Sequence, residues 1–174
     1  MSRHNLFLVL ACSFSIAGPS FAAERHLGAH VHGQATVDVA IDGDHLQVGL
    51  HVPGHDAVGF EHPPTSDAEK RTLAHAIATL KAAHWLEPAK RAGCRLLGAN
   101  VSAPALQGVP TGGHANVDAT YDFSCADMTK LDALDIRLVE AFPSVQRIVV
   151  DVVSSSGGGE QVLERGVVRV DIKP

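Results

Sequence analysis

The sequence predicts an α+β fold: a mainly antiparallel β-sheet, one clear amphipathic helix at about residues 66–83, and a disulfide that ties the second half. Three observations lead to this prediction. Several segments alternate apolar and polar residues, which is the period of half-buried strands. One segment has a helix-capping motif followed by apolar residues at helical spacing. Two cysteines, Cys94 and Cys125, flank a pair of predicted strands.

The N-terminal segment has the layout of a secretory signal peptide. Arg3 supplies the positive charge, residues 6–16 form a short apolar run, and Ser20-Phe21-Ala22 brings small residues to the cleavage position. The apolar run is shorter than the roughly 20 residues that cross a bilayer, so no membrane span is expected. We assign residues 1–22 to a signal peptide that is removed and residues 23–174 to a single exported domain.

Two alternatives remain open at this end of the chain. Cys12 follows Val9-Leu10-Ala11 and could be lipidated, although few apolar residues precede it. Cleavage after Ala23 would leave Glu24-Arg25-His26 as the new N-terminus, and a free amine with histidine third binds Cu(II) or Ni(II). That cleavage would put Phe21 where the peptidase prefers a small residue.

Length and charge limit the classes of function. About 150 residues remain after cleavage, enough for one domain with a real core. The chain has 14 Lys and Arg against 19 Asp and Glu, a net charge of −5, and loss of Arg3 makes the domain more negative. This balance argues against nucleic acid and anionic membranes as partners and suits a protein that attracts cations.

The cysteines agree with export. Once Cys12 is removed, only Cys94 and Cys125 are left, and two cysteines in an oxidising compartment most often pair. Their bond would close a loop of about 30 residues, worth on the order of 3–4 kcal/mol in the chain-entropy model. A thiolate metal site is the alternative, and it is disfavoured because no Cys-x-x-Cys spacing is present.

The first predicted elements form a β-hairpin. Apolar residues alternate on both sides of Asp42-Gly43-Asp44, over residues 37–41 and 46–52. The pleat places His30 and His32 on the polar face of the first strand and His51 on that of the second. A two-residue loop at Asp42-Gly43 would put position 30 opposite 55, whereas a four-residue loop would put 32 opposite 55. Pro53-Gly54 could end the pairing before His55.

A helix and a β-rich second half follow. Ser66-Asp67-Ala68-Glu69 is a capping box, and Leu73, Ile77 and Leu80 continue it at helical spacing to about residue 83. Later strands are predicted at residues 94–101, 117–125, 134–138, 145–153 and 167–172, with a flexible link at 154–159. Residues 127–140 could instead be helical, with Asp127 as the cap.

Histidines are the main chemical signal. Seven of the eleven lie between Arg25 and Pro64, and clustered imidazoles are typical ligands of zinc or another divalent transition metal. Glu61 could be an outer partner that orients an imidazole. For Asp56 we favour a solvated surface residue, as we do for His26 and His114. The candidate metal ligands are His30, His32, His62, His55 and His51.

Catalytic motifs are not apparent. There is no His-Glu-x-x-His helix, no Gly-x-Ser-x-Gly elbow and no phosphate-binding glycine loop, so we expect a binding protein and not an enzyme. A zinc hydrolase is a distant alternative, because no base or oxyanion donor can be named. A second alternative is an envelope protein-interaction module whose histidines are incidental or sense pH.

Several motifs together resemble the ZrgA-like periplasmic zinc-binding proteins, a family formerly known only as a domain of unknown function. They are Ala29-His30-Val31-His32-Gly33 with the hairpin after it, Val58-Gly59-Phe60-Glu61-His62-Pro63, the two cysteines, and Glu140-Ala141-Phe142-Pro143. The most specific are His-x-His-Gly and Gly-Phe-Glu-His-x-Pro.

The resemblance implies a periplasmic protein of a Gram-negative bacterium that serves zinc uptake. Its partners would be the zinc ion and a zinc ABC importer or that importer's binding protein. By position, the resemblance places His30, His32 and His62 in the metal site of the domain. Many members carry a long loop rich in His, Asp and Glu between the two cysteine strands, whereas residues 107–116 of this chain contain one histidine.

Overall fold

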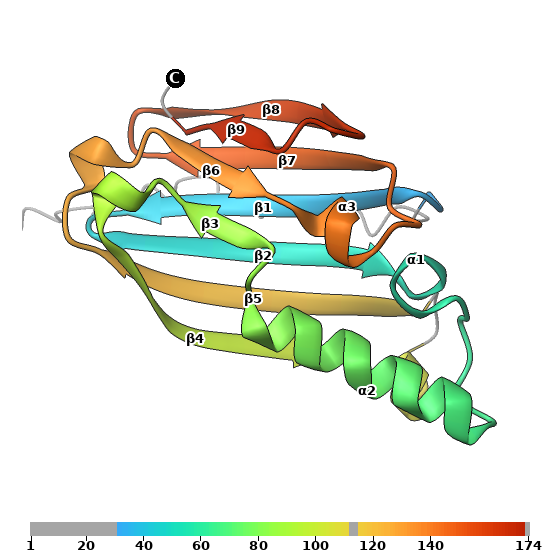
Figure 1. Ribbon diagram of the computed structural model, residues 1–174. Coiled ribbons are helices and arrows are strands. Elements are labelled where there is room, and N and C mark those ends of the chain that lie inside the picture. The colour runs from blue at the N-terminus through green and yellow to red at the C-terminus, as the bar shows by residue number, and fades with distance from the viewer. Residues whose placement is uncertain (1–30, 112–114, 173–174) are drawn as a thin grey trace, which may run out of the picture.

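The computed structural model describes residues 31–111 and 115–172. Its main layer is a six-stranded sheet in the order β4-β5-β2-β1-β7-β8 (Figure 1). The bounds of these strands are β1 (Gln34–Asp42), β2 (His45–Pro53), β4 (Cys94–Ser102), β5 (Asn116–Cys125), β7 (Arg147–Ser154) and β8 (Gly157–Glu164). All neighbours pair antiparallel except β1 and β7, which are parallel. The α+β prediction is confirmed.

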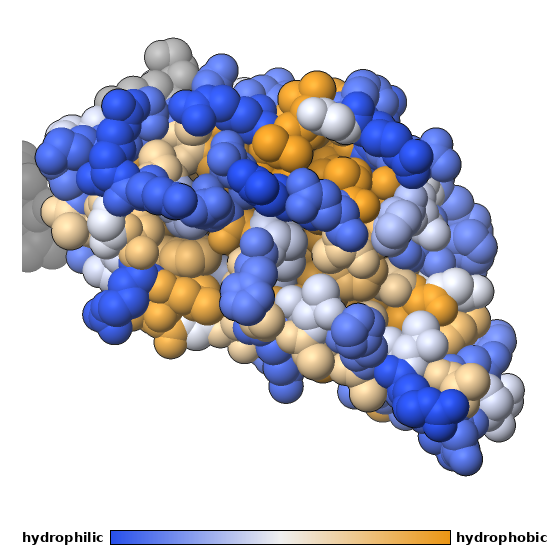
Figure 2. Space-filling model, in the orientation of Figure 1, coloured by the Kyte–Doolittle hydropathy of each residue, from blue (hydrophilic) through white to orange (hydrophobic). Residues whose placement is uncertain are grey.

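A second layer covers one face of this sheet. It consists of helix α2 (Asp67–Ala82) and a three-stranded sheet in the order β3-β6-β9 (Figure 1). The bounds of the small strands are β3 (Leu86–Pro88), β6 (Ala133–Ile136) and β9 (Arg169–Asp171). Figure 2 shows this side in the same orientation: along α2, hydrophilic residues are interspersed with apolar residues and residues of intermediate hydropathy.

The core lies between the two layers. One face of each central strand is buried, with Val37, Val39, Leu46, Val48 and Leu50 at 0–1 % exposure. The buried hydroxyl of Tyr121 accepts a hydrogen bond from Trp85 Nε1 at 3.3 Å and donates one to the carbonyl of Leu80 at 3.0 Å. These contacts join the end of α2 to β5, and burial raises the pKa of Tyr121 to about 12.

The β1–β2 hairpin has one of the two predicted registers. Asp42 pairs with His45, so the turn is Gly43-Asp44, and Gly43 adopts φ +59°, which favours glycine. Thr36 therefore lies opposite His51, and the same register extended beyond the strands would place 32 opposite 55. This register was expected for a four-residue loop, but here it is reached with a turn of two residues, Gly43-Asp44.

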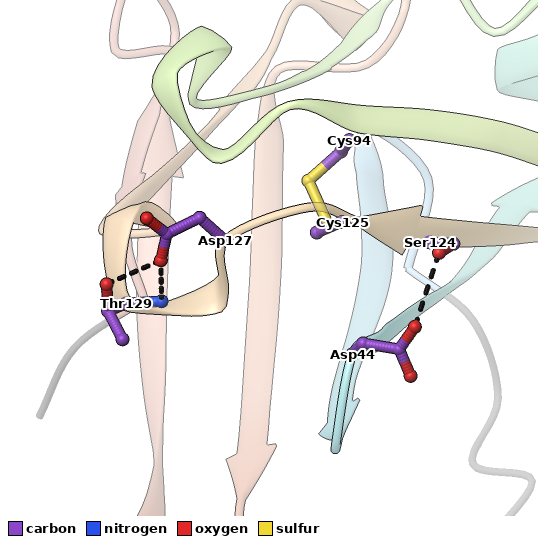
Figure 3. The surroundings of a disulfide bond; sticks show 6 residues. All are labelled: Asp44, Cys94, Ser124, Cys125, Asp127 and Thr129. Atoms are coloured by element: carbon purple, nitrogen blue, oxygen red, sulfur yellow. Dashed lines mark hydrogen bonds between the residues drawn. A yellow bond between two sulfur atoms is a disulfide. The ribbon is translucent and has the colours of Figure 1, made fainter.

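The predicted capping box and disulfide are both confirmed. The Ser66 side chain accepts from Glu69 N, and the Glu69 carboxylate accepts from Ser66 N at the start of α2. Cys94 and Cys125 are bonded and directly opposite each other in the β4–β5 pair (Figure 3). Beside them the Asp127 carboxylate caps a short 3₁₀ helix, η3 (Met128–Lys130), by accepting from Thr129 N.

Two further predictions were wrong in part. Residues 154–159 are not a flexible link: Ser154 pairs with Gly157, and β8 continues from there along β7. A Cβ at Gly158 would lie 2.7 Å from the Val152 carbonyl oxygen, so glycine permits this close pairing. Leu138 lies not in the strand but in the short helix α3 (Leu138–Ala141), which follows β6.

Some features lie outside these predictions or outside the described residues. The pattern did not predict helix α1 (Gly54–Val58), the 3₁₀ helices η1 (Lys90–Ala92) and η2 (Ala105–Gln107), or β3. The signal peptide, His26, His30 and His114 are outside the described residues. None of the helices described is long and apolar enough to cross a membrane.

Candidate metal centre

Two predicted ligands, His32 and His55, meet at the end of the hairpin opposite the Gly43-Asp44 turn. Their rings stack with centroids 4.8 Å apart and planes 19° from parallel. His32 Nε2 also lies 3.0 Å from Glu61 Oε1. The side chains of His32 and His55 are 55 % and 52 % exposed, so an ion from solvent can reach them.

Helix α1 places His55 in this group. Pro53 ends β2, and the N–H of Gly54 donates to the Ala115 carbonyl at 2.7 Å. A Cβ at Gly54 would lie 2.8 Å from the same oxygen, so glycine is required where α1 begins. Gly59 ends the helix at φ +87° and returns its N–H to the His55 carbonyl. The tight turn brings the following loop, with Glu61, back to His32.

Asp56 is buried directly beneath the two histidines. Its side chain is 2 % exposed, and Oδ2 accepts a hydrogen bond from the backbone N–H of Gly33 at 2.7 Å. Its other oxygen, Oδ1, lies 3.5 Å from His55 Nδ1. Our interpretation of Asp56 as a solvated surface residue was therefore wrong, because α1 turns this side chain inward while His55 stays outside.

His62 lies in the same loop but has different contacts. Its Nδ1 donates to the Pro63 carbonyl at 3.0 Å, and its ring stacks on Phe60 with centroids 5.3 Å apart. Nε2 is 4.0 Å from Glu69 Oε1. The hydrogen bond from Thr65 N lowers the pKa of the Glu69 carboxyl. Glu61, the candidate outer partner of an imidazole, contacts His32.

His51 belongs to another group, on the exposed face of the large sheet. Its Nδ1 lies 2.8 Å from Asp118 Oδ1 on β5, and its Nε2 lies 3.3 Å from Asp38 Oδ2 on β1. Hydrogen bonds raise the pKa of His51 to about 9; the bond to Asp118 contributes most, followed by the bond to Asp38. The imidazole is therefore held as a cation between two carboxylates at neutral pH.

The side chains of His32, His55 and Glu61 carry atoms that suit a borderline cation such as zinc. Imidazole nitrogens and carboxylate oxygens are the ligands that zinc takes from such residues. Within residues 31–111 and 115–172, no three His, Cys, Asp or Glu side chains are arranged as ligands of one ion. The stacked rings of His32 and His55 would have to rotate for their nitrogens to point at a common centre.

An open groove gives access to this group. His32, His55 and Asp56 form one side, and the other is formed by residues that connect α3 to β7 or lie on β7 and β8: Ser144, Gln146, Arg147 and Glu164. Arg147 and Glu164 pair across the two strands at 3.8 Å. The groove therefore has carboxylates on both sides.

Sequence reasoning missed three carboxylates that contact the histidines. Asp56 is buried, and Asp38 and Asp118 flank His51. Asp38 could have been found, because it lies on the polar face of β1 and His51 lies on the same face of the neighbouring strand β2. Asp118 could not, because the pairing of β5 with β2 joins residues 67 apart in sequence.

The sequence was compared with known protein families and with curated proteins. A family described as "ZrgA family zinc uptake protein" matches residues 29–172, which is most of the sequence. No curated protein matches the chain at a significant level. The matched residues include His32 and the segment from His55 to His62, which contains His55, Glu61 and His62.

Proposed function

The chain belongs to the ZrgA family of zinc uptake proteins, and we propose that it is an exported, non-enzymatic protein that binds Zn(II) in the periplasm. It would buffer the ion or deliver it to an importer, either a zinc ABC transporter or that transporter's binding protein. The observation that carries the proposal is the contact of His32 with both His55 and Glu61 at one exposed end of the sheet.

We propose His30, His32 and His62 as ligands, with His55 completing the set. His55 is favoured over His51, because His51 has a carboxylate within 3.3 Å of each ring nitrogen and zinc would have to displace one of them. His55 already stacks on His32. Glu61 would then hold the His32 ring through Nε2, which is the role that carboxylates play beside metal-binding histidines.

Calorimetric titration tests this proposal. The protein is purified from the periplasm, stripped with a chelator and titrated with zinc at pH 7.5. We expect saturable binding much tighter than millimolar. Because the imidazoles must be neutral to bind, the affinity should fall as the pH drops through roughly 6.5. Binding no tighter than millimolar would refute the proposal.

A matched pair of variants assigns the site. H32A combined with H55A removes both stacked imidazoles and should abolish tight binding. H75A combined with H84A removes two exposed histidines on and just after α2, and should leave the affinity unchanged. Equal affinities in the two double variants would show that the zinc lies elsewhere.

A further inference from the structure

Asp56 is the only buried charged or polar residue in the part of the chain that the structure describes. Burial of a carboxylate is costly unless its oxygens receive hydrogen bonds. Both oxygens have partners here, and the two partners belong to different segments. Oδ2 takes the N–H of Gly33, the residue after His32, and Oδ1 faces Nδ1 of His55.

One side chain thus binds the backbone beside one histidine and contacts the ring of the other. Gly33 has φ +82°, and the turn that it forms precedes β1. The Asp56–Gly33 hydrogen bond ties this turn to α1 across 23 residues of sequence. Asp56 therefore contacts the ring of His55 and the residue after His32, the two histidines whose rings stack at 4.8 Å.

The contact with His55 also selects a tautomer. A carboxylate can only accept a hydrogen bond, so the neutral His55 ring keeps its proton on Nδ1. The lone pair is then on Nε2, which becomes the nitrogen able to ligate a metal. A carboxylate behind a metal-binding imidazole commonly has this effect.

We propose that Asp56 is a positioning residue for the zinc site, which sets the tautomer of His55 and the approach of His32 without touching the ion. This inference rests on the proposed function, because it assigns a role within that site. It adds a residue that the histidine pattern does not reveal, and it names Nε2 as the zinc-binding atom of His55.

D56N separates this role from simple anchoring. The amide oxygen of Asn can still accept from Gly33 N, whereas its NH₂ group would then face His55 Nδ1 and could only donate. The exchange should move the His55 proton to Nε2, as occurs when Asn replaces the carboxylate behind a catalytic histidine. A purely structural role for Asp56 would leave the tautomer unchanged.

The first measurement is made on the metal-free, ¹⁵N-labelled protein at about pH 8.5, above the ordinary titration range of histidine. Ring-nitrogen chemical shifts give the tautomer. We expect wild-type His55 to carry its proton on Nδ1 and the His55 of D56N to carry it on Nε2. A wild-type His55 protonated on Nε2 would overturn the inference, even if D56N failed to fold.

The second measurement is zinc affinity, by competition with a chelator. D56N should bind zinc about 10–100-fold more weakly than wild type, the usual effect of losing such a partner. D122N is the matched control, because Asp122 is on the exposed face and accepts from Gln47. Equal affinity of wild type and D56N would refute the role of Asp56 alone. A wild-type protein that binds no zinc would refute the proposed function.

Discussion

The backbone N–H of Gly33 donates a 2.7 Å hydrogen bond to Oδ2 of Asp56, joining the turn before β1 to helix α1. This bond holds together two segments that strand pairing alone does not reach. β1 begins only at Gln34 and β2 ends at Pro53. The position of His32 beside His55 therefore depends on contacts made beyond the ends of the ladder.

Removal of this carboxylate should destabilise the fold. In D56A the Gly33 N–H loses its partner, which is expected to lower the free energy of unfolding by about 1–3 kcal/mol. Chemical denaturation of the metal-free protein measures the change. D122A, at an exposed position, should stay within about 0.5 kcal/mol of wild type. A stability of D56A equal to that of D122A would contradict the importance of the bond.

The Asp38–His51–Asp118 group should be visible in the titration of one histidine. With the metal removed, His51 is expected to titrate with a pKa of about 9, above its ordinary value of 6.5. NMR of the ring protons between pH 5 and 10 measures this. In D118N the pKa should fall toward its ordinary value, because a neutral amide replaces the carboxylate whose hydrogen bond contributes most. An unshifted His51 in wild type would contradict this geometry.

The Asp38–His51–Asp118 group should also make the free energy of unfolding depend on pH. The pKa of His51 is higher in the folded chain than its ordinary value of 6.5, so the folded state binds the proton more tightly. Its contribution is fully present below about pH 6.5 and is lost as the pH rises toward 9. Because nearly half of the His51 side chain is exposed, solvent screens the effect. Wild type should lose more stability over this window than H51Q.

Loss of the disulfide should affect stability but not zinc binding at the proposed site. Replacement of both Cys94 and Cys125 by Ala is expected to cost about 2–4 kcal/mol. Cys125 N donates to the Asp44 carbonyl, so the bond lies at the turn end of the hairpin, away from His32 and His55. Thermal unfolding and zinc titration of the double variant test the two parts. A large loss of zinc affinity in a folded variant would contradict this separation.

Much of the fold could be predicted from local patterns. The alternation in the hairpin, the capping box at Ser66 and the two cysteines each specify a local structure, and all three are present. The parallel pairing of β1 with β7 could not be predicted, because it joins strands separated by more than 100 residues and leaves no local signature. The strand at 157–164 was missed because consecutive glycines are also typical of linkers.

The candidate site was predictable only in outline. Strand parity and register brought His55 to the vicinity of His32, and the structure stacks the two rings. Parity could not show that α1 would turn Asp56 inward, since one helical turn replaces the expected continuation of the strand. Nor could it show that His51 would be flanked by two carboxylates, one of them from β5.

The most direct measurement of the central claim is an anomalous difference map at the zinc edge, from a crystal of the protein loaded with zinc. We expect a peak about 2.0–2.1 Å from imidazole nitrogens of His32 and His55. At His55 the bonded atom should be Nε2. A peak between His51 and Asp38, or no peak within bonding distance of His32 and His55, would contradict the proposed site.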